Sequence, residues 1–108
     1  MLQLEVQLQL LQAVNKTPAI SQRELAKQLG FSLGKINSCI KDLLDKHWVT
    51  FRRFKNSSNK IAYRYQLTPQ GFRQKEALTA AFLQAKHQQF ESLAKEIDQL
   101  QQHFDKEN

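Results

Sequence analysis

The side chains best suited to chemistry form a small, polar and basic set between residues 32 and 41. An asparagine amide and a lysine ammonium group can each make two hydrogen bonds to the edge of a purine, the amide to adenine and the ammonium to guanine. Serine beside the free amides of a helix start suits a phosphate, and glycine permits close approach. The residues expected to face a DNA groove from one helix are Ser32, Gly34, Lys35, Asn37, Ser38 and Lys41.

A second basic set follows in a segment with the alternating pattern of a β-hairpin. Its cations have few anions nearby and therefore repel one another, which indicates an anionic partner such as the phosphates of DNA. The other interpretation is a solvated hairpin that charge keeps soluble, because edge strands often carry lysine for that reason. The contacts expected from this hairpin, or wing, are Arg52, Arg53, Lys55, Asn56 and Lys60.

The excess positive charge is confined to the middle of the chain. The 108 residues carry a formal net charge of +6, and residues 32–64 hold eight basic and two acidic side chains. Residues 1–31 have a net charge of +1 and residues 65–108 a net charge of −1. Such a distribution is typical of a surface that binds a polyanion.

Neither an enzyme nor a metal or cofactor site is indicated. Cys39 is expected to be a structural thiol, and the histidines at positions 47, 87 and 103 lack the spacing of metal ligands. A single cysteine fits a reducing compartment, and no stretch approaches the roughly 18 apolar residues of a membrane span. We therefore expect a cytoplasmic protein without catalytic residues, metal or cofactors.

Two short helices joined by a tight turn are expected to position the first set. Ser21 and Glu24 form a capping box that begins one helix, and Gly30 ends it. Ser32 can cap the next helix. Its apolar side is expected to consist of Leu33, Ile36, Ile40, Leu43 and Leu44. These features favour a helix-turn-helix over an ordinary helical hairpin.

The remaining elements are predicted from the periodicity of apolar residues and from residues that start or end helices. Residues 1–15 fit either a helix or a strand, and their Leu and Gln composition favours a helix that ends before Pro18. In residues 48–54 and 61–67, apolar or aromatic residues tend to alternate with polar ones, which predicts a β-hairpin around the polar turn 55–60. Thr68 and Pro69 then open a last helix.

This last helix is predicted to run from about Phe72 to about Phe104, roughly 30 residues, and to follow a DNA-binding domain at residues 1–71. Apolar residues spaced three and four apart predict a coiled-coil seam, and hence a homodimer. The alternative is that the helix folds back on its own domain. The expected dimerisation residues of segment 72–108 are Leu83, Phe90, Leu93, Ile97, Leu100 and Phe104.

Over nearly its whole length the chain resembles the MarR family of winged helix-turn-helix regulators, and most closely its short EPS-associated branch. The motifs that carry the resemblance are SQRELA (21–26), LG (29–30), SLGKIN (32–37), KHWV (46–49), FKN (54–56) and LTPQG (67–71). The resemblance implies a mainly α fold with a small β-hairpin (α+β). It also implies that the second helix of the motif enters the major groove and that flanking helices dimerise. The implied function is a sequence-specific transcriptional regulator that binds double-stranded DNA, acting as a homodimer on an inverted repeat; a small-molecule effector stays unknown.

Two other functions remain open at this point. A winged helix used as a protein-interaction or adaptor module would explain the coiled-coil seam equally well, although it would leave the basic middle third without a partner. RNA binding would use Tyr63 and Tyr65 to stack on bases. Their alternation with Ala62 and Arg64 favours instead a role in the core.

Overall fold

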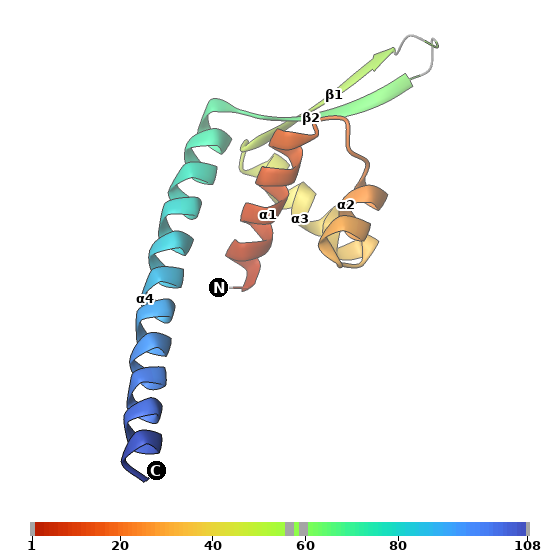
Figure 1. Ribbon diagram of the computed structural model, residues 1–108. Helices are drawn as coiled ribbons and strands as arrows, with labels where there is room; N and C mark the ends of the chain where they lie inside the picture. The colour runs from red at the N-terminus through yellow and green to blue at the C-terminus, as the bar shows by residue number, and fades with distance from the viewer. Residues whose placement is uncertain (1, 56–57, 59–60, 108) are drawn as a thin grey trace. The chain divides into compact units, whose positions relative to one another are not determined.

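The computed structural model describes residues 2–55, 58 and 61–107, without the side chains of residues 2, 3, 54 and 61–63. In these residues it has four α-helices and one antiparallel hairpin (Figure 1), which confirms the predicted fold class. The chain divides into two compact units, Met1–Leu78 and Thr79–Asn108. The elements are α1 (Leu2–Lys16), α2 (Gln22–Leu29), α3 (Leu33–Asp45), β1 (Val49–Lys55), β2 (Ile61–Leu67) and α4 (Pro69–Glu107).

The helix boundaries are set by the capping residues that the sequence predicts. The Ser21 hydroxyl oxygen accepts a hydrogen bond of 3.1 Å from the Glu24 amide at the start of α2. Gly30 ends α2 at a φ of 75°, a conformation that costs glycine no Cβ clash. The Ser32 hydroxyl accepts a hydrogen bond of 3.1 Å from the Lys35 amide at the start of α3. The predicted helix-turn-helix is therefore present.

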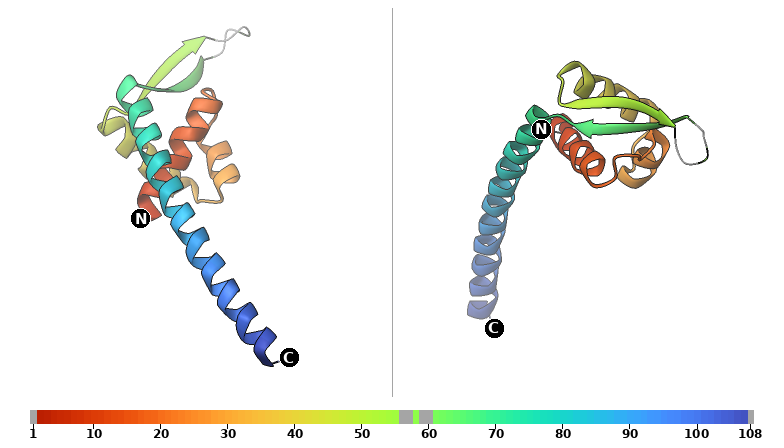
Figure 2. Two further views of the ribbon diagram at one scale, coloured as in Figure 1. Left: turned by 60° about the vertical axis from the view of Figure 1, so that its left-hand side comes forward. Right: turned by 90° about the horizontal axis from the view of Figure 1, so that it is seen from above.

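The core of the N-terminal unit lies between α1, α2, α3 and the base of the hairpin. The first three helices lie on one side of the hairpin (Figures 1 and 2), and α1 and α3 together supply most of the buried apolar side chains of the core. The fully or almost fully buried members are Val6, Leu10, Leu11, Val14, Ile20, Leu25, Ile36, Ile40, Leu43, Val49 and Tyr65.

Leu33 departs from the prediction, because its side chain is 45% exposed. It is the first residue of α3, one turn before Ile36, and the core along this helix begins only at Ile36. The other residues predicted for the apolar side are buried or half-buried against the core. Helical spacing alone gives the direction of a side chain, whereas burial also requires a neighbouring element within reach.

The hairpin is joined to the helices at β2. The strands pair from Val49 opposite Leu67 to Lys55 opposite Ile61, and Figure 1 shows the hairpin projecting beyond the helices. The Tyr65 amide donates a 3.0 Å hydrogen bond to the carbonyl oxygen of Pro18. The side-chain amide nitrogen of Gln22, Nε2, donates a 3.1 Å hydrogen bond to the Tyr65 hydroxyl oxygen. The base of the hairpin is thereby fixed against the segment that leads into α2.

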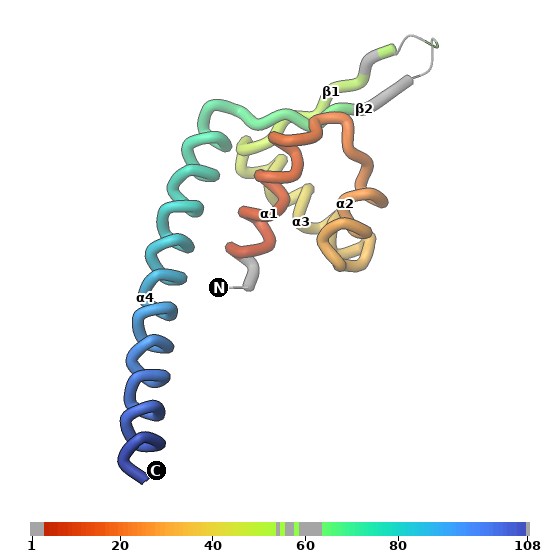
Figure 3. The backbone as a smooth tube through the Cα atoms, in the orientation of Figure 1, coloured from red at the N-terminus to blue at the C-terminus, as the bar shows by residue number. Residues whose placement is uncertain are grey.

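The start of α4, which follows β2 in the backbone trace of Figure 3, is hydrogen-bonded to the turn between α3 and β1. The Thr68 hydroxyl accepts a 2.9 Å hydrogen bond from the Gly71 amide and donates one of 2.6 Å to the carbonyl of His47. His47 itself has a φ of 59°, which is uncommon for a residue other than glycine. Gly71 is buried, and a Cβ at this position would overlap the carbonyl of Trp48. From here α4 runs for 39 residues, which is longer than predicted.

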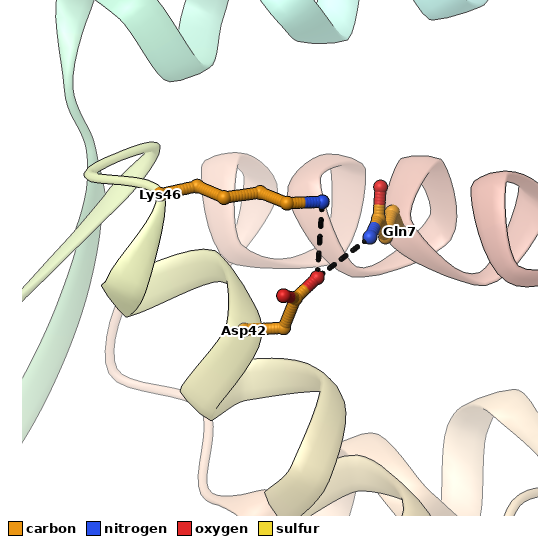
Figure 4. Close-up of polar contacts among 3 residues, drawn as sticks. All are labelled: Gln7, Asp42 and Lys46. Atoms are coloured by element: carbon orange, nitrogen blue, oxygen red, sulfur yellow. Dashed lines mark hydrogen bonds and ion pairs between the residues drawn. The ribbon is translucent and has the colours of Figure 1, made fainter.

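A polar contact that the sequence does not predict links α1 with the end of α3 (Figure 4). The Gln7 side chain is 2% exposed, and its amide nitrogen donates a 2.8 Å hydrogen bond to Asp42 Oδ2. The same oxygen pairs with the Lys46 ammonium group at 3.1 Å. Gln7 Oε1 is buried and has no hydrogen-bond partner in the part of the chain that the structure describes.

Candidate nucleic-acid interface

Helix α3 has two chemically different sides. Ile36, Ile40 and Leu43 are at most 1% exposed and pack into the core. The opposite side is polar and basic, and every residue predicted to face DNA from this helix is exposed: Ser32, Gly34, Lys35, Asn37, Ser38 and Lys41. The fold therefore places the predicted set together on one accessible surface.

The two lysines of this surface are not neutralised within the chain. Neither Lys35 nor Lys41 forms an ion pair with any residue that the structure describes. The Lys35 ammonium nitrogen lies 4.7 Å from the centre of the Phe31 ring, a cation–π contact at the turn before α3. Both charges remain available to an anionic partner.

Gly34 is not explained by packing within the chain. Beyond its chain neighbours and its own helix backbone, a Cβ added at this position would have no atom of the described residues within 4 Å, and no positive φ requires glycine there. An alanine would favour the helix. The open space at the first turn of α3 is what the close approach of another molecule would use.

The wing supplies a second basic surface. Arg52, Arg53 and Lys55 are exposed, whereas Asn56 and Lys60 lie outside the described residues. Arg52 is the register partner of Arg64, which is also exposed. Like charges directly opposite each other destabilise a strand pair.

The C-terminal unit exposes an apolar surface on α4, which we call the C-terminal seam. Its members are 54% to 69% exposed, and they are the residues predicted for dimerisation: Leu83, Phe90, Leu93, Ile97, Leu100 and Phe104. A stripe of large apolar side chains at this spacing suits packing against another helix.

The described residues contain no cluster of three or more His, Cys, Asp or Glu side chains that could hold a metal ion. Cys39 is a free, half-buried thiol packed against the core. Among the same residues, no helix combines the length and apolar composition that a membrane span requires.

Residues 3–50 match the family model described as winged helix-turn-helix DNA-binding. No curated protein matches the sequence significantly. The Mycobacterium tuberculosis MarR family protein Rv2887, solved with salicylic acid, has a TM-score of 0.62 at 20% identity, over 77% of this chain and 60% of that one. The S. aureus MepR–DNA complex has a TM-score of 0.60 at 21% identity, over 80% and 58%. A mutant of S. aureus MepR has a TM-score of 0.64 at 20% identity, over 96% and 74%.

The chain thus spans about three fifths of the length of Rv2887. At these identities the similarity shows a shared fold, which confirms the resemblance to MarR family regulators; the closer resemblance to the EPS-associated branch stays a prediction. The chain contains a winged helix-turn-helix and has the fold of the MarR family regulators.

Proposed function

We propose that the chain is a transcriptional regulator that binds double-stranded DNA sequence-specifically, as a homodimer on an inverted repeat. The observation that carries this proposal is the exposed polar and basic side of α3, which lies opposite a buried apolar side. The match to the winged helix-turn-helix DNA-binding model and the fold shared with a MepR solved on DNA support it.

Each contact of α3 would have a separate role in the major groove. Asn37 would make two hydrogen bonds to an adenine and Lys35 two to a guanine, each contributing roughly 1–3 kcal/mol of discrimination between bases. Ser32 would contact a phosphate beside the start of α3, and Gly34 would let the DNA approach there. Ser38 and Lys41 would lie farther along the same surface, with Lys41 on a phosphate.

The wing contacts would position the domain on the duplex rather than select its sequence. Arg52, Arg53 and Lys55 would neutralise phosphates, and Asn56 and Lys60, which lie outside the described residues, are expected to add to this contact. Contacts to phosphates set affinity and register but carry no base information.

The C-terminal seam is proposed to pair with a second copy of the chain. Leaving six large apolar side chains in water forgoes roughly 1.5–3 kcal/mol for each. A symmetric pair of chains would bury them and would present two α3 helices to two half-sites, about one helical turn of DNA apart.

The test is selection of bound fragments from random duplex DNA, followed by binding titrations at several salt concentrations. We expect an inverted repeat. Asn37→Ala should reduce the preference for this site over random DNA by at least about fivefold, because the amide contacts a base. Arg53→Ala should weaken all duplexes alike and lower the salt slope by about one, because it neutralises a phosphate.

Equal losses on selected and random DNA for Asn37→Ala would contradict base contact at that residue. Absence of steeply salt-dependent binding to any duplex would contradict the regulator itself. That result would favour the protein-interaction module.

A further inference from the structure

Leu33 is a large apolar side chain at the start of α3, at the border between its apolar side and its polar and basic surface. Leu33 is 45% exposed although it belongs to the N-terminal unit, which contains the core. Its neighbours in sequence are the exposed Ser32 and Gly34.

Helical geometry places Leu33 in line with two residues of the proposed DNA contact. Positions three and four apart are neighbours on a helix. On one side Leu33 therefore adjoins the buried core residue Ile36, and on the other side Leu33, Asn37 and Lys41 form one row along α3. All three are exposed. The row thus carries an apolar group at the start of the helix, an amide in the middle and a cation at the far end.

A recognition helix in the major groove of DNA meets both base edges and phosphates. The apolar group exposed in that groove is the methyl at C5 of a pyrimidine, and the amide of Asn37 suits the adenine edge beside it. An exposed leucine at the start of a recognition helix, in the same row as Asn37, therefore has a matching apolar partner on DNA.

We propose that Leu33 is a specificity-determining residue that contacts the C5 methyl group of a pyrimidine, in thymine or 5-methylcytosine. The inference rests on the proposed function and adds to it the identity of a base. Neighbouring positions in the row are about 5–6 Å apart, and base pairs are about 3.4 Å apart. The methyl group contacted by Leu33 therefore lies one or two base pairs from the adenine bound by Asn37.

The experiment removes the methyl group from the DNA, which leaves the protein unchanged. Each thymine of the selected duplex is replaced in turn by deoxyuridine, and affinity is measured for the full-length wild type, Leu33→Ala and Leu4→Ala. We expect one thymine in each half-site whose methyl group strengthens wild-type binding about fourfold, the effect of burying one such group. Leu33→Ala should bind the thymine and uracil duplexes equally.

Leu4→Ala is the matched control, because Leu4 is the same residue type on α1 and is 42% exposed. It should keep the wild-type ratio between the two duplexes. The inference would be overturned if the wild type bound the thymine and uracil duplexes equally at every position. It would also be overturned if Leu33→Ala kept the wild-type ratio between the two duplexes. In either case the preference for the selected site would still support the proposed function. A wild type without any sequence preference would overturn both.

A last pair of duplexes distinguishes the two pyrimidines. At the sensitive position, the T·A pair is replaced by C·G and by 5-methyl-C·G. Tighter binding of the methylated duplex by the wild type, and not by Leu33→Ala, assigns the contact to the methyl group in either base. Equal binding of both cytosine duplexes assigns it to thymine alone.

Discussion

At the scale of single residues, two glycines occupy helical first turns for opposite reasons. Gly71 lies where α4 crosses the turn after α3, and the space of its missing side chain is filled by the Trp48 backbone. Gly34 borders open space at the start of α3. The fold requires a glycine at position 71, whereas none of the residues that the structure describes requires one at position 34.

Gly71→Ala should therefore destabilise the protein by about 2–3 kcal/mol, because a backbone carbonyl cannot move aside as a flexible side chain would. Gly34→Ala is the matched control and should leave stability unchanged or raise it by up to about 1 kcal/mol. Chemical denaturation followed by circular dichroism measures both. Equal stability of Gly71→Ala and the wild type would show that α4 can shift away from Trp48 at no cost.

Residues whose role is local were predictable, and those whose role depends on distant neighbours were not. Ser21, Gly30 and Ser32 could be assigned because a cap involves only the next few residues. The exposure of Leu33 and the burial of Gln7 depend on where α1 and α3 meet, which no spacing in the sequence records. The DNA-contact roles of the α3 and wing residues stay predictions.

At the scale of elements, Thr68 joins three of them. Its hydroxyl caps α4 through the Gly71 amide and holds the carbonyl of His47, at the end of the turn that follows α3. Its own amide donates a 3.0 Å hydrogen bond to the carbonyl of Trp48. The sequence predicts the cap, whereas the contact with His47 appears only once the hairpin has folded back.

Replacing Thr68 by valine keeps the side-chain shape and removes both hydroxyl contacts. We expect a loss of about 1–2 kcal/mol of stability, the usual effect of losing a helix cap. Thr50→Val is the control, because the hydroxyl of Thr50 makes a single exposed hydrogen bond of 3.4 Å. Its effect should stay below about 0.5 kcal/mol. The melting temperatures of the two variants are compared by thermal unfolding. Equal melting temperatures would show that the Thr68 hydroxyl does not stabilise the junction between α4 and the turn after α3.

At the scale of the whole molecule, the predicted organisation was an N-terminal DNA-binding domain and a C-terminal dimerisation helix. The structure divides the chain between Leu78 and Thr79, because the first turns of α4 belong with the N-terminal unit. The segment from about Phe72 to about Phe104 is rich in helix-favouring residues and contains no proline or glycine, so the sequence predicts one long helix there. The pairing of two seams stays a prediction, because it depends on a second chain.

Ile97→Lys places a charge in the middle of the C-terminal seam and should dissociate the proposed dimer. Because the seam is exposed in the single chain, the variant should keep its fold and its helix content. Gln99→Lys, two residues away and on another side of α4, is the charge-matched control. Sedimentation velocity should show monomers for Ile97→Lys only, together with a loss of DNA affinity. A dimer that survives Ile97→Lys would place the contact between chains elsewhere.

Gly34 has a consequence for how this chain would evolve. Selection for stability alone would replace it with alanine, since the fold offers room and the helix would gain from the change. Under the proposed function, selection for operator binding would retain the glycine. The first turn of α3 is then a position where the sequence has kept a less stable residue so that DNA can approach the backbone.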